Sequence, residues 1–257
     1  MSPPVFLLSV PELANAQSGS VVDVTGSEGR HAVTVVRVKP GEVVDLVDGV
    51  GRRATGAVAA VSGADTFTVR IDQVIDSPEP DVRFHVVQAL PKSDRGELAV
   101  ELMTEIGVDV VTPWAAERCV TRWKADRAER AHRKWCDSAM AAAKQSRRSR
   151  VPRISALATS SEVCLIVESA ALALLLDEEA SSPLADITPP ISGDIVLIVG
   201  PEGGVTSNEA AAFVAAGART VVLGSNVLRT STAGPAALAA LAVITGRWSE
   251  TPGAMGG

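Results

Sequence analysis

Two glycine-bearing segments near the C-terminal end have the residue types of a ligand-binding site. The first is Gly200-Pro201-Glu202-Gly203-Gly204, which follows the aliphatic run Ile195–Val199 and precedes Thr206, a good helix N-cap. Glycines that follow a buried strand let a ligand approach the backbone closely. On the glycines alone, a ligand site and a plain strand-to-helix turn fit equally well. The segment lacks G-x-G-x-x-G, which disfavours a dinucleotide site, and lacks G-K-[ST], which excludes a P-loop.

The second segment runs from Leu223 to Pro235 and also joins an expected strand to an expected helix. It carries Arg229 among small polar residues, where a guanidinium suits a phosphate or a substrate carbonyl. An ordinary solvated arginine is the alternative. Only twelve positions (223 − 211) separate Ala211 from Leu223. We therefore expect the strands before the two segments to be neighbours, with both loops at one edge of a sheet.

Alternating strands and helices position these two segments. The expected elements are strands at 84–90, 108–111, 172–176, 195–199 and 220–223, and helices at 93–106, 125–145, 208–216 and 235–245. Such alternation is typical of an α/β fold with a mostly parallel sheet and helices on both faces. Ligands of such sheets bind at the carboxyl ends of the strands.

The first 75 residues instead favour a small β-barrel. Short β-branched runs at 43–47, 54–61 and 66–75 alternate with turn signals such as Lys39-Pro40-Gly41. The segment Ser77-Pro78-Glu79-Pro80 marks the expected boundary, because its prolines remove backbone donors and force extended chain. We therefore expect a β-barrel domain at 1–76 and an α/β domain at 77–257.

The net charge of −6 conceals a basic stripe. From Arg118 to Arg153 twelve Lys and Arg residues stand against three Asp and Glu residues, a net charge of +9 (12 − 3), while both ends of the chain are acidic. Clustered cations fit RNA phosphates. A solvated helix face is the alternative interpretation.

Cysteine, histidine and hydropathy patterns disfavour two other classes of protein. The three cysteines and three histidines are scattered without metal-ligand spacing, so we expect no metal. Residues 1–6 lack a basic n-region and a long apolar run, and the longest apolar stretch, Leu165–Leu176, is too short to span a bilayer. We therefore expect a cytoplasmic protein with no membrane contact.

Taken in order along the chain, the motifs resemble the RsmE family of SPOUT RNA methyltransferases. GPEGG at 200–204 and LGSNVLRTSTA at 223–233 are similar to the paired signature loops of that family. RHAVTVVRVKPGE at 30–42, EIGV at 105–108 and QSRR at 145–148 also match its pattern. The resemblance therefore covers nearly the whole chain.

The resemblance implies a SPOUT α/β domain with a deep trefoil knot, preceded by a PUA-like β-barrel that helps hold RNA, in a homodimer. It implies S-adenosylmethionine as cofactor and, as reaction, methylation of N3 of a specific uridine in the decoding region of 16S rRNA in the small ribosomal subunit. Carried over by motif, the cofactor pocket would be lined by Leu175, Leu176, Glu178, Gly200, Glu202, Gly203, Leu223, Gly224, Leu228 and Ala233.

Within this resemblance, Arg229 is the candidate for stabilising negative charge on the uracil, and Glu202 is the candidate for the general base. RNA contacts are expected from Arg30, Arg37, Lys92, Arg118, Arg122, Arg147, Arg148 and Arg150. The chain departs from the family at Lys144 and Ser231, where relatives often have Glu. A mechanism that needs a carboxylate at either position does not carry over to this chain.

Two alternatives remain open. A SPOUT enzyme that methylates ribose 2′-hydroxyls would share the signature loops, but it gives no reason for the N-terminal barrel. A non-catalytic RNA-binding protein of ribosome assembly is supported only by Lys144 and Ser231. The methylated atom in the product separates the first from the uridine-N3 reaction, and cofactor binding separates the second.

Overall fold

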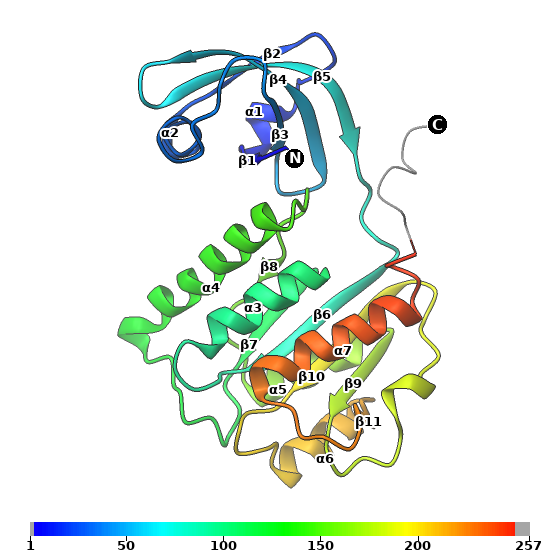
Figure 1. Cartoon of the computed structure of the whole chain (residues 1–257). Helices are drawn as coiled ribbons and strands as arrows, with labels where there is room; N and C mark the ends of the chain where they lie inside the picture. Colours follow the sequence, from blue (N-terminus) through cyan, green and yellow to red (C-terminus); the bar gives the residue numbers. More distant parts are fainter. Residues whose placement is uncertain (1–2, 250–257) are drawn as a thin grey trace. The chain divides into compact units, whose positions relative to one another are not determined.

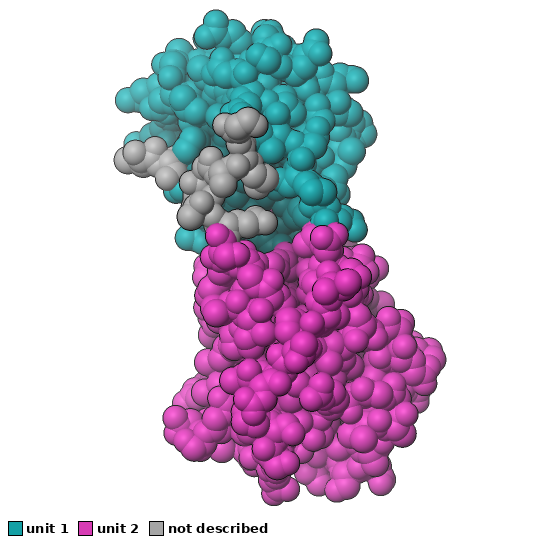
Figure 2. Space-filling model, turned by 90° about the vertical axis from the view of Figure 1, so that its right-hand side faces the viewer, with its two compact units in different colours: residues 1–79, 143–151 teal, residues 80–142, 152–257 magenta. Residues whose placement is uncertain are grey.

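The chain forms two compact units. The computed structural model describes residues 3–249, apart from the side chains of residues 125 and 126. One unit comprises Met1–Glu79 with Ala143–Val151, and the other comprises Pro80–Ala142 with Pro152–Gly257. Figure 2 colours them separately. The chain thus returns to the N-terminal unit at the end of a long helix, α4 (Ala125–Gln145).

The N-terminal unit is built on a curled mixed sheet (Figure 1). Its strands lie in the order β1-β3-β4-β5-β2, with β1 and β3 parallel and the other pairs antiparallel. Their bounds are β1 (Val5–Leu7), β2 (Val21–Val24), β3 (Val43–Val47), β4 (Arg52–Ser62) and β5 (Thr66–Asp76). The expected barrel is therefore a half-barrel, with β1 and β2 at the edges of its sheet.

Two irregularities bend the long β4–β5 hairpin of this sheet. The register shifts at Thr55/Gly56 and at Val58/Ala60, and such bulges increase the local twist of a strand. A side chain at Gly56 would lie 2.2 Å from the carbonyl oxygen of Arg70, so only glycine allows this close approach. The curled sheet encloses a core in which Phe6 and Phe67 meet edge to face, 5.1 Å between ring centroids.

Two helical segments that the strand pattern did not predict lie within the first 75 residues. A short helix, α1 (Val10–Leu13), and a longer helical stretch interrupt the strands. The longer stretch begins as α2 (Gly26–Arg30) and continues as a π-helix, η1 (His31–Val36), which Arg37 ends in the left-handed conformation. Val35 and Val36 are exposed there, so their β propensity is not reinforced by burial against a sheet.

The C-terminal unit is a parallel α/β sheet, as expected. Its strands lie in the order β11-β9-β10-β6-β7-β8, and every pair is parallel. The strands are β6 (Val82–Ala89), β7 (Val110–Trp114), β8 (Arg153–Ile154), β9 (Leu172–Leu176), β10 (Gly193–Val199) and β11 (Arg219–Val221). The prediction that the strands before the two glycine segments are neighbours is wrong, because β9 lies between β10 and β11.

Helices cover the sheet of this unit on both sides. The helices are α3 (Arg95–Ile106), α4, α5 (Ser160–Ser169), η2 (Leu184–Asp186, a 3-10 turn), α6 (Ser207–Ala215) and α7 (Thr230–Ile244). In Figure 1, α7 and α3 lie in front of the sheet, and α5 and α6 lie behind it. α7 packs on α3, β6 and β10, and its buried face includes Leu238 and Leu241. This packing fixes the start of α7 at the carboxyl edge of the sheet.

A buried histidine in β6 should make stability depend on pH. His85 is 7% exposed, and its Nε2 lies 2.8 Å from the hydroxyl of Thr112. Burial lowers the pKa of His85 to about 4, because the charged ring loses its solvation; Asp194 opposes this effect, while Arg153 and Arg83 add to it. The unfolded chain therefore binds the proton more readily between about pH 4 and pH 6.5. The free energy of unfolding should fall as the pH drops through that range, by up to about 3 kcal/mol.

The variant His85→Gln isolates this effect. Glutamine can still hydrogen-bond to the hydroxyl of Thr112 but does not titrate, so the variant should lose less stability than the wild type on acidification. Urea unfolding at several pH values between 4.5 and 6.5 measures the difference. Parallel stability curves for the two proteins would show that His85 does not carry the effect.

Candidate functional site

A cavity of about 1200 Å³ lies at the carboxyl ends of β9, β10 and β11 in the C-terminal unit. Three loops line it: residues 175–179 leaving β9, residues 199–205 leaving β10, and residues 221–230 leaving β11. The two glycine segments therefore meet at one cavity even though their strands are not neighbours. Parallel strands make this possible, because all their carboxyl ends lie at the same edge.

The residues that the sequence predicts to bind the cofactor line this cavity. All ten of them line it: Leu175, Leu176, Glu178, Gly200, Glu202, Gly203, Leu223, Gly224, Leu228 and Ala233. Arg229, the candidate for charge stabilisation, lines it too. The structure thus brings the cofactor residues and both catalytic candidates together, while the role of each residue remains a prediction.

Part of the cavity wall is apolar and part is bare backbone. Leu175, Val199 and Val221 are almost fully buried and line it with aliphatic carbon. Gly203 lines the cavity with backbone atoms alone. A Cβ atom added at this position would lie 3.1 Å from Cβ of Arg118, so a side chain there would be crowded. Aliphatic walls with a few backbone polar groups are typical of small-molecule and cofactor sites.

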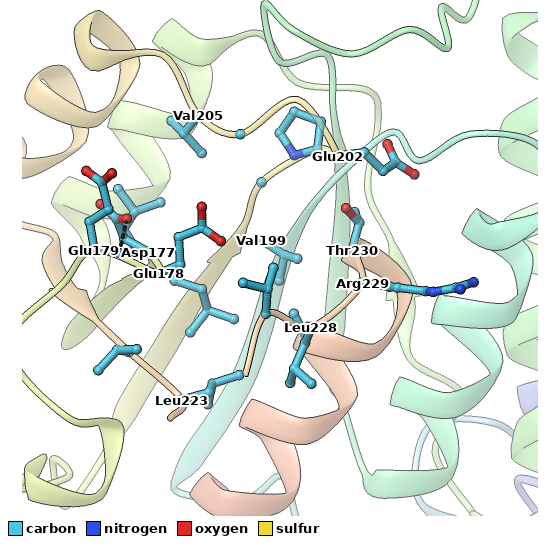
Figure 3. A pocket seen from close by; sticks show the side chains of 18 of the residues that line it. Asp177, Glu178, Glu179, Val199, Glu202, Val205, Leu223, Leu228, Arg229 and Thr230 are labelled. Carbon is cyan, nitrogen blue, oxygen red and sulfur yellow. Dashed lines mark hydrogen bonds between the residues drawn. The ribbon is translucent and has the colours of Figure 1, made fainter. Parts of the chain in front are cut away.

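Three acidic side chains gather on one side of the cavity, while the other side holds Arg229 together with Glu202. Figure 3 shows Asp177, Glu178 and Glu179 grouped on one side, where β9 ends, and Arg229 on the other. Lys92, Arg95 and Arg118 also line the cavity. The site therefore offers carboxylates to a positively charged ligand and guanidinium or ammonium groups to an anion.

Two hydrogen bonds hold the loop after β10 against the side of the cavity that Lys92, Arg95 and Arg118 line, which is its basic side. Arg118 Nη1 donates to the carbonyl oxygen of Gly203 at 3.1 Å. The backbone N–H of Lys92 donates to Glu202 Oε1 at 3.1 Å. The loop then enters α6 through Thr206, the predicted N-cap, whose hydroxyl accepts from the N–H of Glu209. Glu202 is thus held at the cavity rim by the chain that follows β6.

The residues expected to contact RNA are divided between the two units. Lys92, Arg118 and Arg122 belong to the C-terminal unit, and the first two line the cavity. Arg122 is exposed, but its guanidinium also donates to the carbonyl oxygens of Ala116 (3.1 Å) and Glu117 (2.8 Å). Arg122 therefore stabilises the chain after β7 and is also accessible to solvent.

The other five expected RNA contacts belong to the N-terminal unit. Arg30, Arg37 and Arg147 are exposed, whereas Arg148 and Arg150 are half-buried. Arg150 Nη2 donates to the carbonyl oxygen of Ser77 at 2.7 Å. This contact gives Arg150 a structural role inside its unit, and the three exposed arginines remain the more accessible cations.

The sequence reasoning missed several residues that line the cavity. Among them are Asp177, Glu179 and Arg95. The two carboxylates flank Glu178 directly after an expected strand, so their place at a carboxyl edge was a usable signal. Arg95 lies at the start of α3, and nothing in its local sequence distinguishes it from a surface arginine.

The two departures from the family pattern have structural explanations. Lys144 belongs to the N-terminal unit, where its Nζ lies 2.7 and 2.8 Å from the two carboxylate oxygens of Glu28. Glu28 Oε2 also accepts from the N–H of Leu7 at 3.1 Å. A glutamate at position 144 would face Glu28 with a like charge. Ser231 is 2% exposed at the start of α7, a site with little room for a larger charged side chain.

Family models match both parts of the chain. A model described as an RNA methyltransferase domain matches residues 78–242, and one described as an RNA methyltransferase PUA domain matches residues 24–72. The first match covers the sheet that holds the cavity, and the second falls within the half-barrel.

Curated relatives and solved structures agree with these matches. Ribosomal RNA small subunit methyltransferase E of Mycobacterium tuberculosis is 43% identical over 238 residues, which cover 91% of this chain and 90% of the relative. A structure of that methyltransferase from Neisseria gonorrhoeae, bound to S-adenosyl methionine, has a TM-score of 0.82 at 30% identity and covers 95% of this chain and 98% of its own. A methyltransferase of Legionella pneumophila in complex with the same cofactor has a TM-score of 0.82 at 26% identity, with the same coverage.

Proposed function

Since the chain belongs to the ribosomal RNA small subunit methyltransferase E family, we propose that it transfers a methyl group from S-adenosylmethionine to N3 of a uridine in the decoding region of 16S rRNA. One observation carries the proposal: both signature loops and Arg229 line a single cavity at the carboxyl edge of the parallel sheet. The relatives whose structures hold S-adenosyl methionine support the choice of cofactor.

The cavity fits the cofactor in size and chemistry. Its volume of about 1200 Å³ exceeds what a ligand of that size needs and leaves room for a base. Leu175, Leu223 and Leu228 are suited to enclose the adenine, and the bare backbone at Gly200 and Gly203 is suited to hydrogen-bond it. When bound, S-adenosylmethionine supplies a methyl group that its sulfonium already activates. The chain itself must therefore position the uracil and remove its proton.

The residues on the basic side of the cavity are suited to that task. Uridine N3 carries a proton, and its loss leaves negative charge on the two uracil oxygens. Arg229 can donate hydrogen bonds to those oxygens, and its permanent charge needs no reorganisation as the charge develops. Arg118 and Lys92 are suited to hold the flanking phosphates. Most of the rate would then come from positioning.

Glu202 is the candidate base, and its replacement by glutamine tests that role. Glu202→Gln should lower kcat/KM about tenfold near pH 7, below the usual contribution of a positioned base, because a uracil proton can also leave to solvent. The loss should shrink as the pH rises and hydroxide takes over. Initial rates from pH 6 to pH 9 measure this convergence, and a loss that is constant over the range would assign Glu202 to positioning instead.

The half-barrel and a second copy of the chain complete the proposed enzyme. We assign residues 1–76 to a PUA-like RNA-binding domain and residues 77–257 to a knotted SPOUT domain. Arg30 and Arg37 are the proposed phosphate contacts of the first domain, and Arg147, in the segment that returns to the N-terminal unit, is a third. A homodimer is supported by exposed apolar side chains on and before α7, namely Val227 (77%) and Val243 (66%). We propose that the substrate is 16S rRNA within the small ribosomal subunit.

We place the protein in the cytoplasm, where that rRNA is found. Within residues 3–249, no helix is both long enough and apolar enough to cross a bilayer.

Direct binding of S-adenosylmethionine is the simplest test of the proposed site. Calorimetric titration of the purified protein should give saturable binding, and S-adenosylhomocysteine should compete. If the folded protein bound neither, the non-catalytic RNA-binding alternative would take the place of the proposed function.

A further inference from the structure

A buried carboxylate on α6 joins three separate segments behind the cavity. Glu209 is 6% exposed. Its Oε1 accepts from the backbone N–H of Glu117 at 2.9 Å and from the hydroxyl of Ser160 at 2.8 Å. Its Oε2 accepts from the N–H of Thr206 at 3.2 Å and from the hydroxyl of the same residue at 2.9 Å. Four donors therefore converge on one carboxylate.

Two of these segments lead directly to the cavity wall. Thr206 ends the loop that begins at Gly200, and Glu117 immediately precedes Arg118. Arg118 in turn donates to the carbonyl oxygen of Gly203 in the same loop. Glu209 thus ties the chain after β7 to the loop after β10, and the Arg118–Gly203 contact closes the connection from the other end.

The third segment anchors this connection in the core. Ser160, which donates to Glu209, also accepts from Trp114 Nε1 at 3.1 Å. Trp114 is fully buried and meets Phe213 of α6 edge to face, with 5.2 Å between ring centroids. The carboxylate is therefore linked to a rigid part of the sheet, so that a loop held by it has little freedom to move.

Glu209 is charged in this environment. Burial raises the pKa of its carboxyl, but the hydrogen bonds from Glu117, Ser160 and Thr206 outweigh burial and leave the pKa below its usual value. A charged acceptor makes stronger hydrogen bonds than a neutral one. A neutral replacement would weaken all these contacts and would leave buried donors without a partner.

We propose that Glu209 is a positioning residue for cofactor binding: through Glu117 and Thr206 it holds the Gly200–Gly204 loop and Arg118 in the conformation that receives the ligand. This inference rests on the proposed function of the cavity. It assigns the effect to a side chain that does not line the cavity. Because the loop is shaped before the ligand arrives, binding does not have to order it.

A second capping box in the same unit provides a matched control. At the start of α5, Glu162 accepts from the N–H (2.7 Å) and the hydroxyl (2.8 Å) of Thr159, as Glu209 does from Thr206. Glu162 is exposed, and these two hydrogen bonds join its carboxylate to the residue that begins its own helix. Replacing Glu162 with glutamine therefore weakens a cap of the same kind, and it leaves Glu117, Ser160 and Thr206 in place as donors to Glu209.

The test compares Glu209→Gln with Glu162→Gln by calorimetric titration of S-adenosylmethionine, with the melting temperature measured alongside. Glutamine keeps the size of the side chain, but its amide nitrogen cannot accept. We expect the dissociation constant of Glu209→Gln to rise about tenfold. Glu162→Gln should bind within about twofold of the wild type, although both variants lose some stability.

The outcomes separate this inference from the proposed function. Equal dissociation constants for the wild type and Glu209→Gln, at a lowered melting temperature, would reduce Glu209 to a structural cap and overturn the inference. Absence of binding in the wild type would instead contradict the proposed function. If Glu209→Gln does not fold, Ser160→Ala removes one donor and leaves the cap of α6 intact; it should weaken binding severalfold, and unchanged binding would overturn the inference.

Discussion

Replacing Arg229 with alanine should lower kcat about 100- to 1000-fold while changing the dissociation constant of S-adenosylmethionine by less than about threefold. The range is that found when a donor to a developing oxyanion is removed. Arg229 is exposed at the N-cap of α7 and lines the cavity on the side away from Asp177 and Glu179 (Figure 3). Its charge is therefore available to the uracil, and the aliphatic and glycine walls suited to the cofactor remain in the variant.

Two further measurements make this prediction specific. Arg229→Lys keeps the charge but loses the planar pair of donors, so it should recover only part of the rate. Single-turnover rates with saturating RNA, combined with calorimetric binding of the cofactor, separate chemistry from affinity. Equal losses in turnover and in cofactor affinity would place Arg229 among the cofactor-binding residues instead.

Replacing Gly203 with valine should raise the dissociation constant of S-adenosylmethionine about 10- to 100-fold. A Cβ at this position already lies 3.1 Å from Cβ and 3.3 Å from the carbonyl oxygen of Arg118, and valine adds two methyl groups beyond it. Relief of such crowding costs about 1 to 3 kcal/mol. We expect the loop to move away from Arg118 and to break the bond between Arg118 Nη1 and the Gly203 carbonyl.

Gly217→Ala is the matched control for this loop variant. Gly217 follows α6 with φ at +112°, and an added Cβ would meet nothing within 4 Å. The substitution strains the backbone and should lower the melting temperature, but it lies outside the residues that line the cavity. If Gly203→Val bound the cofactor as tightly as Gly217→Ala does, the loop after β10 would not contribute to the site.

The parallel sheet and its site were predictable because local patterns determine them. The strand at 172–176 and the helix at 125–145 have the predicted bounds, since their hydrophobic periodicity is strong and their ends carry clear turn or polar signals. The helix expected at 235–245 begins earlier, at Thr230, so that Pro235 lies inside α7 and not at its start. The proline suggested a helix start because it cannot donate a backbone hydrogen bond within a helix. The loops meet at one cavity because alternating strands and helices give a parallel sheet, and the carboxyl ends of parallel strands all lie at the same edge.

The errors lie where structure depends on contacts that are distant in sequence. A separation of twelve residues between Ala211 and Leu223 suggested neighbouring strands, but a strand earlier in the chain, β9, is inserted between β10 and β11. Likewise, the hydrogen bonds from Glu117 and Ser160 to Glu209 span 92 and 49 positions. Only the local part of that network, the Thr206 and Glu209 capping box, has a sequence signal.

Transfer of labelled methyl groups from S-adenosylmethionine to small ribosomal subunits that lack the modification tests the central claim most directly. The RNA is then digested to nucleosides and the labelled nucleoside is identified. The proposed function predicts label in 3-methyluridine from 16S rRNA, and loss of that label with Arg229→Ala. Label in a 2′-O-methyl nucleoside, or no label from a protein that binds the cofactor, would contradict it.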